Sequence, residues 1–145
     1  MNNSFSVDMY RDALLSITRG SHAGKYINAK PIFILAVMSL IEKKEIVDNH
    51  ILYSDSLKEE YRQLYEQYET IGVTPMFKPY VFLSADSFYH FRWKGEPQPL
   101  PHDARTKYIH DHISYAYFDN ALWDLLQDKE TRDYLRDSII NYYLK

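Results

Sequence analysis

The residues from 28 to 41, NAKPIFILAVMSLI, constrain the fold more than any other part of the chain. Nine of the ten residues from 32 to 41 are apolar, so a helix here presents no polar face to water. Asn28 stands at the expected N-cap, and Pro31 falls in the first turn, where a missing N–H costs nothing. The run is too short to span a bilayer, which needs roughly 20 apolar residues. We therefore predict a central helix that other elements cover.

The size and composition of the chain indicate one domain over residues 1–145. With 145 residues and a hydrophobic content of 46%, the chain is long enough for one compact core. It has no cysteine, which excludes disulfides, thiolate catalysis and cysteine-ligated metal sites. No basic and then apolar leader opens the sequence, and with the lack of cysteine this predicts a cytoplasmic protein.

Charge is distributed unevenly along the chain. The formal net charge of −3 argues against a protein coated with positive potential. However, residues 13–41 contain no acid but include Arg19, His22, Lys25 and Lys30. The loop expected at 21–27 leads into the N-terminus of the central helix, where the helix dipole favours an anion. The sequence thus predicts a local anion site, with scattered solvated cations as the alternative.

Periodicity and turn residues place the other elements. Apolar residues at helical spacing predict amphipathic helices, and a turn-forming group between two aromatic runs predicts a β-hairpin. The predicted elements are helices at 7–19, 56–68, 120–127 and 130–144, a short β-prone piece at 50–52, a hairpin at 77–93 entered at Pro79, a surface loop at 94–104, and a segment at 106–117 that fits either a helix or a strand. The predicted class is α+β and mainly helical, with a central buried helix, amphipathic helices around it and one antiparallel hairpin or small sheet.

No motif in the sequence predicts a catalytic site. His110 and His112 would converge on a metal only if they lay on a strand, and solvated histidines are the alternative. Glu42 and Lys44 match part of a nuclease metal motif, but they fall at the end of a helix. The chain has no glycine-rich phosphate loop, nucleophile elbow or HNH motif. We therefore predict a binding module with no catalytic residue, metal or cofactor in this chain.

The order of three motifs gives the chain a family resemblance. These are Lys30-Pro31 before the aliphatic helix, Lys78-Pro79-Tyr80 leading into FLSADSFYHF, and the tail FDNALWDLLQDKETRDYLRDSIINYYL. Together they resemble the N-terminal DNA sulfur-recognition domain of phosphorothioate-dependent HNH restriction endonucleases, and the resemblance covers almost the full chain. It implies a mainly helical domain that binds duplex DNA in which sulfur replaces a non-bridging phosphate oxygen. In that family a separate C-terminal HNH domain cuts the DNA, and the resemblance implies that this domain is missing here.

The resemblance also implies where the sulfur binds. In the family a proline at the start of the hairpin contacts sulfur, and Pro79, followed by Tyr80, stands at the matching position. The residue before this proline is commonly aromatic, whereas here it is Lys78. The residue three positions after it is commonly small, whereas here it is Phe82. These two departures predict an altered shape for the apolar cup that covers the sulfur, and with it either an altered or a lost preference for sulfur.

Phosphate contacts are expected from cations near these motifs. Lys25 and Lys30 stand where the family is richer in arginine, and Tyr26 beside them is a candidate for stacking or hydrogen bonding. Arg105 and Lys107 fall in a later region where the family also carries basic residues. Cations of this kind hold DNA by pairing with phosphates and releasing counterions.

The resemblance implies a role in bacterial defence, as part of or accessory to an HNH-type restriction endonuclease. The expected partners are duplex DNA carrying phosphorothioate and an HNH nuclease domain or protein, with a homodimer left open and no membrane. One alternative is a protein-interaction or regulatory domain that has kept the fold without binding DNA. Another, ranked last, is a metal-dependent nuclease that uses His110 and His112.

Overall fold

The structure, a computed structural model, describes residues 4–69 and 73–145. Over these ranges the fold is α+β and mainly helical, as predicted, with seven α-helices and two antiparallel sheets of two strands each. The elements are α1 (Ser4–Leu14), β1 (Ser21–His22), β2 (Lys25–Tyr26), α2 (Ala29–Glu42), α3 (Asp55–Tyr68), α4 (Phe77–Phe82), the 3-10 helix η1 (Leu83–Ala85), β3 (Tyr89–Trp93), α5 (Thr106–His112), β4 (Ile113–Phe118), α6 (Asn120–Leu126) and α7 (Lys129–Tyr143).

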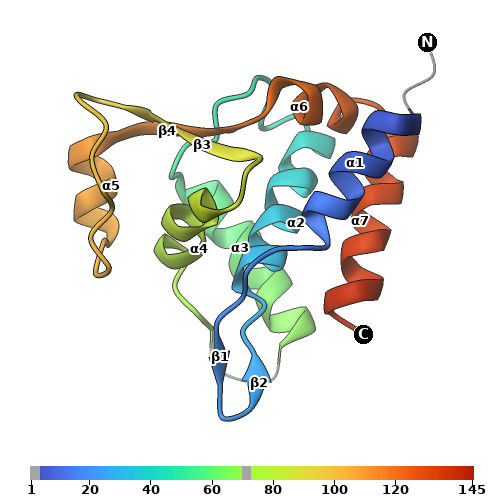
Figure 1. Ribbon diagram of the computed structural model, residues 1–145, viewed down its shortest axis with the longest axis horizontal. Coiled ribbons are helices and arrows are strands. Elements are labelled where there is room, and N and C mark those ends of the chain that lie inside the picture. Colours follow the sequence, from blue (N-terminus) through green and yellow to red (C-terminus); the bar gives the residue numbers. More distant parts are fainter. Residues whose placement is uncertain (1–3, 70–72) are drawn as a thin grey trace.

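Helix α2 is the central element, as its sequence predicts. It contacts α3, α4 and α7, and Figure 1 shows it in the middle of the molecule with α1 and α7 on one side. All of its residues are buried except Lys30 and Ser39, which are half-buried, and Glu42 at its end. In the part of the chain that the structure describes, no helix is both long and apolar enough to cross a membrane.

Two helices begin or end at residues other than those predicted. Helix α1 begins at Ser4 rather than at residue 7, and it ends at Leu14 rather than at residue 19. The reason for the early end is tertiary, because the Tyr143 hydroxyl of α7 donates to Leu14 O and accepts from Ile17 N, at 2.6 and 3.1 Å. Helix α3 begins after Ser54, whose Oγ accepts from Leu57 N at 3.2 Å, and not at the predicted cap Ser56.

The predicted hairpin at 77–93 is wrong. Residues 77–82 form helix α4, and β3 pairs with β4, with Tyr89 opposite Phe118 and Phe91 opposite Ala116. Tyr80 and Val81 are both buried, which one strand with a single covered face does not achieve, whereas a helix packed against α2 and α5 does. Pro79 falls in the first turn of α4, where its missing N–H costs nothing.

The structure also assigns the remaining predicted segments, at 106–117, 50–52, 21–27 and 94–104. Residues 106–117, which fit a helix or a strand by sequence, form both, as α5 followed by β4. Ile51, in the short β-prone piece, bridges Ala116 from the other side of β4 with hydrogen bonds of 2.7 and 3.0 Å. The loop expected at 21–27 contains the small hairpin β1–β2, and residues 94–104 contain no helix or strand.

The hydroxyl of Tyr80 ties α4 to this sheet. It is 1% exposed and donates to Ile51 O at 2.7 Å, and burial raises its pKa above the ordinary value. We predict that Tyr80→Phe lowers the free energy of unfolding by about 1 kcal/mol, because one buried hydrogen bond is lost while Ile51 O keeps its bond from Ala116. Urea unfolding measures this. Tyr134→Phe, at an exposed position, is the matched control, and equal stability of the two variants would contradict the prediction.

Candidate nucleic-acid interface

Three adjoining cavities lie where the β1–β2 hairpin, the start of α2 and the start of α4 meet. Figure 1 shows this hairpin projecting at the end of the molecule where α2 begins. The first cavity, of about 260 Å³, shares Ile27 and Thr74 with the second and Lys78 and Phe82 with the third, each of which is about 190 Å³. Among the described residues, the cations that line them are Arg19, Lys25, Lys30, Lys78 and Arg105, and the carboxylates are Glu69 and Asp103.

The first cavity combines an apolar wall with cations. Pro79 and Phe82 of α4 line it together with Ile27 and Ala29, and its cations are Arg19, Lys30 and Lys78. Pro79 is buried within the first turn of α4, and Lys78 beside it is exposed. Four of the residues predicted from the sequence, Lys30, Lys78, Pro79 and Phe82, therefore meet at one cavity.

Lys30 is held in place by a nearby acid. Its Nζ lies 3.4 Å from Asp86 Oδ2, and both side chains are mostly buried, at 15% and 9% exposed. Asp86 also accepts a hydrogen bond from Thr18 N at 3.4 Å. This pairing fixes the ammonium group at the cavity and offsets part of its charge, so an incoming anion competes with Asp86 for Lys30.

Arg19 is the cation that sequence reasoning did not select as a site residue. Its guanidinium lies 3.9 Å from the centre of the Tyr26 ring and 4.6 Å from that of Tyr143, and it donates to Asn28 Oδ1 at 2.9 Å. Contacts on rings and an amide hold this planar cation rigidly. Arg19 belongs to the acid-free segment 13–41, which indicated an anion site. Its position in the fold, however, depends on Tyr143 at the other end of the chain.

Asn28 occupies the predicted N-cap of α2 but does not act as a side-chain cap. Its side chain accepts from Arg19 and donates to Glu69 Oε1 at 2.9 Å. The amide therefore organises the cavity wall rather than closing the helix end. The first-turn residues Ala29 and Lys30 line the first cavity, which places the positive end of the helix dipole beside it.

The second and third cavities extend this surface on both sides. Lys25 and Tyr26 of β2 line the second cavity, and the Tyr26 ring is 62% exposed. Arg105 lines the third, with its guanidinium 5.5 Å from the centre of the Phe77 ring. The cations thus follow a continuous path from the β1–β2 hairpin, across the start of α4, to the start of α5.

Two predicted site residues are not brought to this surface. Tyr80 is a core residue at 1% exposure, so its side chain does not line this surface and instead ties α4 to Ile51. Lys107 lies on the exposed side of α5, where its Nζ is 2.6 Å from Asp111 Oδ2, and it does not line the three cavities. His110 and His112 both lie in α5, and residues 4–69 and 73–145 hold no group of three candidate metal ligands.

Comparison with models of protein families finds no match for the chain, and comparison with curated proteins finds none either. The resemblance carried by the motifs around Lys30, Pro79 and the C-terminal tail therefore stays a prediction.

Proposed function

We propose that this protein binds duplex DNA along the three cavities and that the first cavity accepts a phosphate in which sulfur replaces one oxygen. The observation that carries the proposal is the first cavity itself, which Pro79 and Phe82 line together with cations that suit a phosphate. The nuclease activity, in this proposal, comes from an HNH domain or protein that acts with this module, in the cytoplasm.

Preference for sulfur has a physical basis in this cavity. A phosphorothioate keeps the negative charge of a phosphate, but its sulfur is larger and less well hydrated than oxygen. Apolar groups such as Pro79 and Phe82 gain by covering such an atom and lose by stripping water from an ordinary oxygen. The cavity therefore selects by its apolar wall, whereas Lys30 and Lys78 attract both kinds of DNA.

The cations supply affinity without sequence information. Lys25, Lys78 and Arg105 line adjoining cavities of one surface, where each can pair with a phosphate. Phosphate contacts of this kind make binding depend on salt. Because the formal net charge of the chain is −3, attraction of DNA must come from this local surface and not from the protein as a whole.

The test compares two duplexes that differ by one sulfur atom, using fluorescence polarisation. We expect the phosphorothioate duplex to bind about fivefold more tightly or better, which corresponds to roughly 1 kcal/mol. Pro79→Ala should reduce this preference to less than about twofold while leaving the helix intact, because alanine favours helix. Pro99→Ala, in the exposed loop 94–104, is the matched control and should keep the preference. Equal binding of the two duplexes by the wild type would contradict the proposed preference for phosphorothioate.

Lys25 offers a separate prediction about affinity. Its side chain lies on the exposed β2 strand and lines the second cavity, which Pro79 and Phe82 do not line. We predict that Lys25→Ala weakens binding of both duplexes by the same factor and reduces the slope of log K against log salt by about 1. A change in the preference for sulfur would show instead that Lys25 acts on the first cavity.

A further inference from the structure

Another cavity, of about 120 Å³, lies along the second half of α2, between α3 and α7. Its residues are Leu35, Met38, Ser39 and Glu42 of α2, Leu64 and Tyr68 of α3, and Arg132, Arg136 and Ile140 of α7. None of these residues lines the three cavities proposed to bind DNA. This cavity is therefore a separate feature, with an aliphatic part and two guanidinium groups.

Arg132 is the unusual residue in this cavity. It is only 8% exposed, and its Nη1 donates to Leu126 O at 2.8 Å. Its buried Nε has no hydrogen-bond partner among the described residues. Buried polar groups in proteins are nearly always hydrogen-bonded, and a guanidinium has five N–H donors. Because Nε is itself inaccessible, the donors that Arg132 keeps for a ligand are those of Nη2, which lies 3.9 Å from Glu42 Oε1 and makes no hydrogen bond within the described residues, while the side chain lines the aliphatic cavity.

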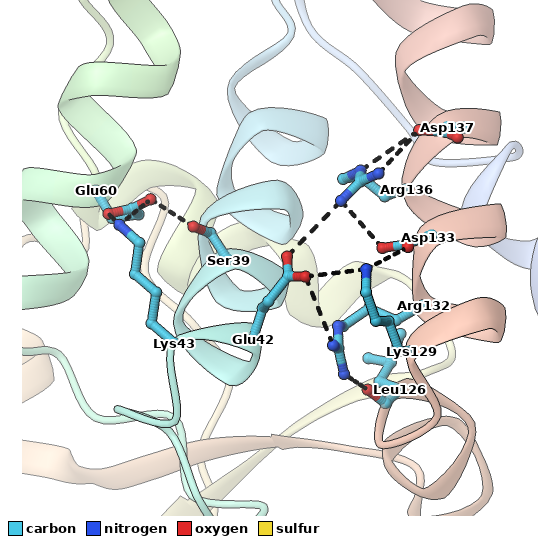
Figure 2. Close-up of polar contacts among 10 residues, drawn as sticks. All are labelled: Ser39, Glu42, Lys43, Glu60, Leu126, Lys129, Arg132, Asp133, Arg136 and Asp137. Atoms are coloured by element: carbon cyan, nitrogen blue, oxygen red, sulfur yellow. Dashed lines mark hydrogen bonds and ion pairs between the residues drawn. The ribbon is translucent and has the colours of Figure 1, made fainter.

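The nearest carboxylate does not satisfy Arg132. Figure 2 shows Lys129, Arg132 and Arg136 of α7 turned toward Glu42. The nitrogen atoms of these three cations lie 3.5, 3.9 and 3.8 Å from the Glu42 carboxylate, all longer than a charge-assisted hydrogen bond. Glu42 is therefore shared among three cations and makes no close bond to Arg132.

The second carboxylate of this cluster, that of Asp133, pairs with Arg136 and Lys129. Arg136 Nη1 lies 3.1 Å from Asp133, and Lys129 Nζ lies 2.8 Å from the same residue. Arg132 is consequently the cation of this cluster that lacks a close carboxylate.

We propose that this cavity binds a small monocarboxylate with a short aliphatic chain. Its carboxylate accepts hydrogen bonds from Arg132, and its chain lies among Leu35, Met38, Leu64 and Ile140. An apolar cavity of about 150 Å³ takes the six carbon atoms of benzene, so about 120 Å³ fits a chain of about four or five carbon atoms beyond the carboxylate. Inorganic phosphate suits the cavity poorly because the aliphatic side chains leave its oxygens without donors.

Hexanoate is the probe for this site, followed by ¹⁵N–¹H correlation spectra of the full chain. We expect saturable shifts in amides of α2, α3 and α7 around the cavity. Hexanol has the same chain without the carboxylate, and inorganic phosphate has the charge without the chain. Both should bind at least about tenfold more weakly than hexanoate, because each lacks one of the two contacts.

Three substitutions test the assigned roles. Glu42→Gln removes the competing carboxylate and should tighten hexanoate binding by about twofold or more, whereas Arg132→Met should weaken it about tenfold. Ile140→Trp fills the cavity from a half-buried position and should abolish binding even if Arg132→Met fails to fold. Tyr134→Trp, at an exposed position on the same helix, is the matched control and should bind as the wild type does.

Several outcomes would overturn the site. They are equal binding of hexanol and hexanoate, binding by the Ile140→Trp protein, hexanoate shifts that fall only around β1–β2 and α4, and the absence of any saturable shift. Each readout is independent of DNA, so failure of this site leaves the DNA proposal untouched.

Discussion

Replacing Lys25 and Lys78 together by glutamate will weaken binding of duplex DNA about a hundredfold or more at low salt. Both side chains are exposed and line different cavities of the same surface, so the double variant removes two phosphate contacts and adds two repulsive charges. Because neither lysine packs in the core, the fold should survive. Polarisation titration with an unmodified duplex measures the effect.

The control for this variant makes the same change in net charge at the other end of α2. Lys44→Glu with Lys129→Glu alters two exposed residues that are remote in the fold from the three cavities. The substitution at 129 also places a glutamate beside Asp133 and Glu42, which Lys129 contacts at 2.8 and 3.5 Å, so circular dichroism checks that the control folds. If the control weakens DNA binding as strongly as the double variant does, attraction depends on total charge and the proposed surface is wrong.

Phe33→Ala will lower the free energy of unfolding by about 3–5 kcal/mol, the usual cost of removing a fully buried aromatic ring. Phe33, in the first half of α2, is 0% exposed, and its ring lies edge-to-face with those of Tyr80 and Tyr89 at centroid distances of 5.9 and 6.0 Å. It therefore joins the central helix to α4 and β3. Urea unfolding, with circular dichroism as the signal, measures the change.

The matched control for this prediction is Phe5→Ala. Phe5 is 82% exposed on α1, so its truncation should change the free energy of unfolding by less than about 0.5 kcal/mol. A loss of less than about 1 kcal/mol for Phe33→Ala would contradict the central role assigned to α2.

The sequence predicts elements whose signal is local and complete within one segment. The central helix was expected at 28–41 and is Ala29–Glu42, and the last helix was expected at 130–144 and is Lys129–Tyr143. The prediction of a hairpin at 77–93 was wrong because the two aromatic runs in this segment resemble a pair of strands. Strand β3 instead pairs with β4, which follows it after residues 94–112, and no local sequence pattern encodes this pairing.

The sequence likewise predicts part of the candidate site. The motif around Pro79 and the basic residues near Lys30 suggested the residues that the fold brings together. Tyr80 is not among them, because one position after Pro79 on a helix its side chain turns into the core. Arg19 was missed because its position requires Tyr26 and Tyr143, which only the folded chain brings together.

The most direct test of the central claim is a salt series. It measures the dissociation constants of a phosphorothioate duplex and its oxygen twin between about 50 and 200 mM salt. We predict that both constants rise steeply with salt while their ratio stays near its low-salt value, because lysines and arginines bind the phosphates of both duplexes and the apolar wall at Pro79 and Phe82 binds only the sulfur. Equal dissociation constants at every salt concentration, or a ratio that disappears as salt rises, would contradict this assignment.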